Sequence, residues 1–248
     1  MIGSRTEQTI LTALASAAML SGMPVARAQP ERSALHGTVS LASDYVLNGL
    51  SQTYDEPSLR ISLDFEHGSG FFAGGSLSNV GYEAEDRFRT PRDTEVDIYA
   101  GYVWRRDRWM TNLTVSRYRY PGIERRYDYT QATANVSFRD RYFLAVSRSS
   151  SFLSIYDAAE VYRAGVALPW RRDIEVGINA GRFTSSGRLD SSYTFWDVGL
   201  SRPFGRFALD LRYHGNSYER RSLLGNSADN QWVLSATYTY LPLRRQDR

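Results

Sequence analysis

The chain of 248 residues contains no cysteine and no lysine, and after its first 28 residues it contains no long hydrophobic run. Without cysteine it has neither a disulfide framework nor a thiolate metal site. Without a run of about 20 apolar residues it has no candidate membrane-spanning helix. All thirty basic residues are arginine, and the net charge of +3 is spread along the chain. No concentrated basic stripe points to a nucleic-acid partner.

Histidine is also scarce: the three residues His36, His67 and His214 lie far apart and form no metal-ligand motif. The sequence therefore predicts no metal site and no cofactor. The Gly-x-Ser-x-Gly nucleophile motif is absent, so we expect no enzyme. One alternative stays open, an outer-membrane lipid hydrolase in which His214 acts as base beside Asn216 and Ser217.

Residues 1–28 have the features of a secretory signal. Arg5 provides a basic start, residues 10–20 form a short apolar run, and Ala26-Arg27-Ala28 fits a small-x-small cleavage site. The run is too short to span a membrane as a helix. We therefore expect export, with residues 29–248 forming one mature domain.

Alternation of apolar and polar residues is the main pattern of the mature chain. In residues 58–66, Leu59, Ile61, Leu63 and Phe65 alternate with polar and charged residues. Residues 232–240 alternate in the same way and are rich in aromatic residues. This period of two predicts strands with one apolar and one polar face. The same test predicts further strands near 36–48, 71–80, 94–104, 109–119, 128–138, 142–148, 159–168, 174–183, 193–202 and 207–214.

The connections between these strands alternate between short and long. The short ones are 67–70, 105–108, 139–141, 169–173 and 203–205, and the long ones are 49–57, 81–93, 121–128, 149–158, 184–192 and 215–230. Outer-membrane barrels have tight periplasmic turns and longer outer loops. The sequence thus predicts an all-β fold, a transmembrane antiparallel up-and-down barrel of about 12 strands in the outer membrane of a Gram-negative bacterium. A soluble all-β sandwich or a secreted β-barrel is the alternative that alternation by itself leaves open.

Several strings resemble the TorF family of proposed porins. Residues 39–53, VSLASDYVLNGLSQT, are similar to its SDY-x-x-RG-x-SQT signature, with Asn48 in place of the usual arginine. Residues 70–74 (GFFAG), 95–102 (EVDIYAGY) and 118–122 (YRYPG) resemble later family strings. The resemblance covers residues 36–240 and implies an outer-membrane barrel with passive solute movement. It implies no particular substrate.

On this register the inward-facing charges are predominantly acidic. The predicted pore-lining residues are Asp44, Arg60, Asp64, Glu66, Glu95, Asp97, Arg163, Glu175, Asp197, Asp210 and Arg212. An acidic surplus in a low-dielectric tube favours cations. We therefore expect a porin-like channel for small hydrophilic solutes that prefers cations. A non-conducting structural or ligand-binding barrel, in which these groups pair and fill the interior, is the alternative.

Arginine and tyrosine gather around Pro121-Gly122. We predict an outer rim made of Arg117, Tyr118, Arg119, Tyr120, Arg125 and Arg126. Such a rim fits an aromatic girdle and lipopolysaccharide phosphates, or a channel mouth that binds sugars or anions. Further expected partners are outer-membrane lipids, the small solutes themselves and the barrel-assembly machinery. The machinery is expected because the aromatic-rich last strand resembles the terminal strand by which outer-membrane barrels are recognised for assembly.

Overall fold

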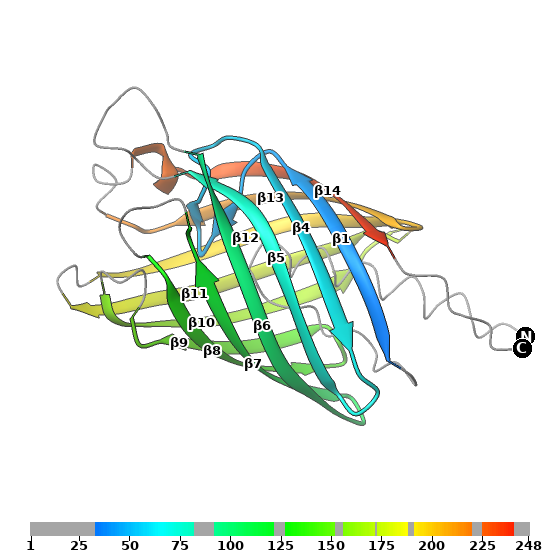
Figure 1. The fold of residues 1–248 in the computed structure, drawn as a ribbon. Helices are drawn as coiled ribbons and strands as arrows, with labels where there is room; N and C mark the ends of the chain where they lie inside the picture. Colours follow the sequence, from blue (N-terminus) through cyan, green and yellow to red (C-terminus); the bar gives the residue numbers. More distant parts are fainter. Residues whose placement is uncertain are drawn as a thin grey trace, which may run out of the picture.

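The computed structural model describes residues 33–81, 92–121, 127–151, 156–171, 173–187, 191–219 and 225–240. Twelve strands form one closed antiparallel barrel (Figure 1). They are β1 (Ala34–Ala42), β4 (Ser58–Glu66), β5 (Phe71–Gly81), β6 (Arg92–Arg106), β7 (Trp109–Arg119), β8 (Tyr129–Phe138), β9 (Tyr142–Ser149), β10 (Tyr156–Pro169), β11 (Glu175–Gly187), β12 (Ser191–Phe204), β13 (Phe207–Asn216) and β14 (Gln231–Tyr240).

The ring closes at β1, which pairs with β4 on one side and with β14 on the other. Gly37, for example, lies opposite Leu63 of β4 and Tyr240 of β14. Every other strand pairs with its neighbours along the chain. The predicted up-and-down barrel of twelve strands is therefore confirmed. Among the described residues, no helix is long and apolar enough to cross a membrane.

The two faces of each strand differ in chemistry, as the alternation predicted. Leu63 of β4 is 57% exposed and Leu234 of β14 is 56% exposed on the outer wall, whereas Val233 and Ser235 are buried on the inner face. In water such a wall would be unstable, but in a bilayer the same side chains contact acyl chains. The sequence thus forms an apolar exterior and a polar interior.

Exposed aromatic side chains gather at the end of the barrel that carries the short turns. They include Phe71, Trp104, Trp109, Tyr142, Trp170, Phe204, Phe207 and Tyr240. Trp109 packs on Phe138, and Phe207 packs on Tyr238, with ring centroids 4.7 and 4.9 Å apart. Aromatic girdles of this kind lie at membrane interfaces.

The short connections occur where they were predicted. Several of their residues have a positive φ, among them Asp107, Asp140, Asp173 and Gly205. Asp and Gly tolerate this conformation better than other residues, which explains their use in tight turns. One predicted long loop was wrong: Thr184 and Ser185 pair with Ser192 and Ser191, so β11 and β12 extend and residues 188–190 alone connect them.

The connection after β1 departs most from the sequence prediction. The first strand ends at Ala42 and not near residue 48, and residues 43–57 fold into the barrel. They contain two short paired strands, β2 (Val46–Leu47) and β3 (Leu50–Ser51). We call residues 43–57 the inner hairpin. Its side chains find hydrogen-bond and packing partners on the inner wall, which a loop in solvent would lack.

Candidate functional site

The inner hairpin turns at Asn48 and Gly49, which have φ angles of 51° and 80°. Two central residues with positive φ make the type I′ turn that Asn-Gly favours. Gly49 also lies close to the barrel wall: a Cβ atom at this position would be 2.8 Å from the Cβ of Phe195 and 3.0 Å from that of Asn216. Glycine is required here both by conformation and by space.

Asp44 holds the base of the inner hairpin together. Its carboxylate accepts hydrogen bonds from Ser51 Oγ at 2.7 Å and from the Thr53 hydroxyl. The backbone N–H of Gly81 at the end of β5 donates to the Gln52 carbonyl at 2.7 Å. Burial raises the pKa of the Asp44 carboxyl, and the hydrogen bonds from Thr53 and Ser51 oppose that rise. These bonds fix the angle at which the hairpin enters the barrel.

One side of the inner hairpin packs on an aromatic sector of the wall. Tyr45 is buried with Val80 of β5, Tyr118 of β7 and Tyr129 of β8, and Leu47 packs on the same cluster. Tyr118 and Tyr129 stack with ring centroids 4.5 Å apart. The hydroxyl of Tyr45 also donates to Glu95 Oε1 at 3.0 Å.

The tip of the inner hairpin reaches β10, β12 and β13, of which β10 lies nearly opposite β1 in the ring order. Arg163 of β10 donates from Nη2 to Asn48 Oδ1 at 2.7 Å, and Asn216 of β13 donates from Nδ2 to the Gly49 carbonyl at 2.8 Å. Leu50 packs on a second cluster that includes Phe183 and Phe195. The hairpin therefore crosses the lumen and is attached to the wall on both sides.

Below the hairpin, Arg60 of β4 binds two acids of β6. Its Nη2 lies 2.6 Å from Asp97 Oδ2, and its Nη1 lies 3.9 Å from Glu95 Oε1. Tyr120 donates to Glu95 Oε2 at 2.6 Å, and Ser76 donates to Asp97 at 2.9 Å. Glu95 is 1% exposed and Asp97 is 3% exposed. Such buried acids need these partners, because an unpaired buried charge is costly.

A second charged group lies on β12 and β13. Arg212 pairs with Asp210 at 3.1 Å and with Asp197. Asn179 of β11 donates to Asp197 at 2.6 Å. Here Gly177 and Gly199 leave the room that the guanidinium occupies, since a Cβ atom at Gly199 would lie 3.0 Å from Arg212 Cζ.

A third group lies nearer the short turns. His36 Nε2 lies 3.8 Å from carboxylate oxygens of both Asp64 and Glu66. Asp64 also accepts hydrogen bonds from Ser62, at 2.9 Å, and from Tyr99. The Asp64 and Glu66 side chains are 19% and 18% exposed inside a closed barrel. Solvent-sized space must therefore lie beside them.

The structure places the predicted inward charges as follows. Arg60, Asp64, Glu66, Glu95, Asp97, Arg163, Glu175, Asp197, Asp210 and Arg212 project from the inner face of β4, β6, β10, β11, β12 and β13. Asp44 lies on the inner hairpin instead of on the wall. Sequence reasoning missed Arg105, which lies two residues after the buried Val103 and therefore on the same inner face of β6. It also missed the hairpin, although Asn-Gly between short apolar pairs is a strong hairpin signal.

The predicted outer-rim group divides into two. Tyr118 and Tyr120 are buried inside the barrel, so their assignment to an outer girdle was wrong; they fall on the inward parity of β7 and pack beneath the hairpin. Arg117 and Arg119 do project outward and lie 3.3 and 3.6 Å from Asp128. Arg125 and Arg126 lie outside the described residues.

The hydrolase candidates do not meet in the described part of the chain. His214 is buried on the inner face of β13, and its Nε2 has no hydrogen-bond partner there. Ser217 bonds the backbone N–H of Thr194 at 2.9 Å, while Asn216 holds the hairpin tip. Within the described ranges, no cluster of three His, Cys, Asp or Glu residues could hold a metal ion.

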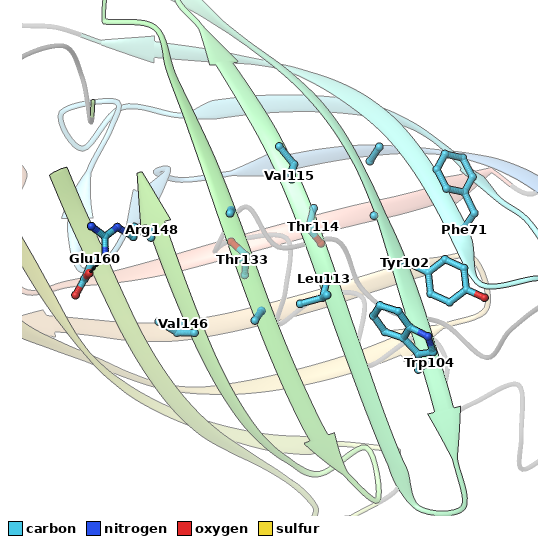
Figure 2. A pocket seen from close by; sticks show the side chains of 14 residues that line it. Phe71, Tyr102, Trp104, Leu113, Thr114, Val115, Thr133, Val146, Arg148 and Glu160 are labelled. Atoms are coloured by element: carbon cyan, nitrogen blue, oxygen red, sulfur yellow. Dashed lines mark hydrogen bonds and ion pairs between the residues drawn. The ribbon is translucent and has the colours of Figure 1, made fainter. Parts of the chain in front are cut away.

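A shallow hollow lies on the outer wall across β5 to β10 (Figure 2). Leu113, Val115 and Val146 line it, and Trp104 stands at one end with Arg148 and Glu160 at the other. The ion pair between Arg148 and Glu160 spans 2.9 Å. Ala100, Ala132 and Ala134 also line the hollow and make it concave, since their side chains are short.

A closed antiparallel barrel with an apolar exterior, an aromatic girdle and a polar, partly solvated interior defines a transmembrane β-barrel. The chain belongs to the Gcw_chp family, described as bacterial proteins of unknown function, which matches residues 28–240. The resemblance to the TorF family in particular stays a prediction. No curated protein sequence matches the chain.

Solved structures with a similar fold include outer-membrane porins and an outer-membrane channel. The KdgM porin gives a TM-score of 0.53 at 9% identity, covering 84% of this chain and 99% of the porin. The NanC porin gives 0.53 at 10%, covering 85% and 100%. An outer membrane channel from Pseudomonas putida F1 gives 0.51 at 13%, covering 86% and 97%. At these identities the similarity concerns the fold.

Proposed function

We propose that the chain is a porin-like channel through which small hydrophilic solutes diffuse across a bacterial outer membrane. The observation that carries this proposal is the solvent-accessible polar interior beneath the inner hairpin, where Asp64, Glu66 and Arg60 keep 17 to 19% of their side-chain surface exposed. A polar lumen replaces part of the hydration of a passing solute. The inner hairpin narrows this lumen. The fold shared with the KdgM porin, also solved in complex with disordered oligogalacturonate, supports the same reading.

We further propose that the channel prefers cations. Within the described ranges the lumen holds the acids Asp44, Asp64, Glu66, Glu95, Asp97, Glu175, Asp197 and Asp210, against Arg60, Arg105, Arg163 and Arg212. Arg163 bonds the neutral Asn48, so it neutralises no acid directly. The surplus of acids gives the lumen a negative potential, which attracts cations and repels anions.

Single-channel recording of the refolded mature chain under a salt gradient tests both proposals. Discrete conductance with a cation-selective reversal potential is expected. Changing Asp64, Glu95 and Asp97 together to the corresponding amides removes three lumen charges and should shift the reversal potential toward anions. A control changes Asp107 and Asp173 to asparagine, which removes two charges from exposed short turns at positive-φ positions that asparagine tolerates.

The control should leave the reversal potential near that of the wild type. An equal shift per removed charge in the lumen variant and in the control would mean that overall charge, and not the lumen, sets selectivity. A folded barrel that never conducts would favour the second candidate function, a structural or ligand-binding barrel. The inner hairpin supports that second candidate, because its contacts with both sides of the wall also suit a permanent plug.

We also propose contacts with the membrane and with export factors. Arg117, Arg148 and Arg182 project from the outer face of β7, β9 and β11, toward the ends of these strands that lie opposite the short turns, where lipopolysaccharide phosphates would meet them. The hollow of Figure 2 offers apolar surface for an acyl chain beside Arg148. Residues 1–28 would direct export, and the aromatic-rich β14 would engage the barrel-assembly machinery.

A further inference from the structure

The inner wall is not uniformly charged. Among the described residues, the inward carboxylates and guanidinium groups come from the inner hairpin or from strands β4, β6 and β10 to β13. On β7, β8 and β9 the inward positions instead carry amides, hydroxyls and apolar groups, and none of their described residues places a charge inside. We call the polar part of this sector the neutral strip: Asn112, Thr114, Gln131, Thr133, Asn135 and Ser147.

The hydrogen bonds within the neutral strip do not satisfy all of its polar atoms. Thr133 and Ser147 share a bond of 2.9 Å between their hydroxyls, and Thr114 donates to Asn112 Oδ1 at 2.7 Å. In contrast, Asn135 Oδ1 has no hydrogen-bond partner among the described residues, and neither has Ser137 Oγ, which follows the strip on β8 and is 7% exposed. Buried polar atoms without partners are costly unless a bound group or water satisfies them.

The centre of the strip faces open space. Gln131, Thr133 and Asn135 of β8 are half-buried, although the barrel around them is closed. On β14, half-way round the ring, Ser235 and Thr237 are buried, with 6% and 5% exposure. Both walls are neutral, but the centre of the strip on β8 is more accessible to a solute than Ser235 and Thr237 of β14.

We infer that the neutral strip binds uncharged polyhydroxy solutes, of the saccharide class, as they pass through the lumen. This inference rests on the proposed channel function. A sugar hydroxyl both donates and accepts, so it can bond the amide and hydroxyl groups of the half-buried Gln131, Thr133 and Asn135 side chains. A carboxylated saccharide would instead be repelled by Asp64 of β4 and by Glu95 and Asp97 of β6, the strand beside β7.

Current blockade in single channels tests the inference, with maltotriose as neutral probe and trigalacturonate as its acidic counterpart. The variant Thr133→Val/Asn135→Leu removes the polar groups at nearly constant volume. Each hydrogen bond lost should weaken blockade by maltotriose roughly two- to tenfold. The control Thr237→Val removes an equivalent hydroxyl, since Thr237 bonds Ser40 at 2.9 Å as Thr133 bonds Ser147.

The expected result is blockade by maltotriose, weakened in the strip variant and unchanged in Thr237→Val, with weaker blockade by trigalacturonate. Heat-modifiable electrophoretic mobility like that of the wild type shows that the strip variant has folded. A conducting channel that trigalacturonate blocks more strongly, or whose blockade by maltotriose is the same in the strip variant, overturns the inference but keeps the channel. A folded barrel without conductance overturns both.

Discussion

Replacing Gly49 by alanine should release the tip of the inner hairpin from the barrel wall. A non-glycine residue in the left-handed region costs about 1–2 kcal/mol. The added Cβ would also lie 2.8 Å from Phe195 Cβ and 3.2 Å from the Gly215 carbonyl, and overpacking of this kind costs about 1–3 kcal/mol. The sum, about 2–5 kcal/mol, is comparable with the bonds at the tip. The hydrogen bond from the charged Arg163 guanidinium to Asn48 contributes about 1.5–3 kcal/mol, and the neutral bond from Asn216 to the Gly49 carbonyl contributes about 1 kcal/mol.

Conductance reports the outcome, because a detached hairpin no longer crosses the lumen. We expect Gly49→Ala to raise the open-channel conductance and to increase current noise. The matched control is Gly205→Ala in the turn between β12 and β13: its φ of 64° imposes similar backbone strain, but nothing lies within 4 Å of the added Cβ. Wild-type conductance in Gly49→Ala, or the same change in both variants, would refute the role assigned to the hairpin.

Two further predictions concern stability. Arg212→Met leaves the inward carboxylates of Asp197 and Asp210 without their cation and should destabilise the barrel by about 3–5 kcal/mol, measured by urea unfolding in lipid vesicles; a loss below 1 kcal/mol would contradict the ion-pair assignment. Leu63→Arg, on the lipid-facing side of β4, should cost about 2–4 kcal/mol in the same assay, whereas Ser62→Arg, facing the lumen, should cost clearly less. A reversed order would contradict the orientation of β4.

The wall of the barrel could be predicted because the patterns that encode it, alternation and turn residues, extend over only a few neighbouring residues. Alternation in residues 58–66 assigns Leu63 and Asp64 to opposite faces without knowledge of any neighbour, and the structure confirms this assignment. Short turns could be located for the same reason, since their residues tolerate positive φ.

The contents of the lumen could not be predicted in the same way. Asn48 meets Arg163 and Gly49 meets Asn216, partners that lie 115 and 167 residues away along the chain. A loop predicted from composition is expected to face solvent, and no pattern in residues 43–57 indicates these partners. The burial of Tyr118 and Tyr120 was missed for a related reason, because they are covered by the hairpin.

The sequence by itself thus determined a single barrel with an apolar exterior, an acidic interior and two unlike rims, because alternation and turn chemistry act over a few residues. Only the tertiary structure decided which charges pair, that the first long connection crosses the lumen, and that a neutral strip on β7 to β9 faces the remaining space. Closing the ring brings β1 beside β14 and carries the inner hairpin to the opposite wall. Those contacts depend on the closed geometry, so no local pattern encodes them.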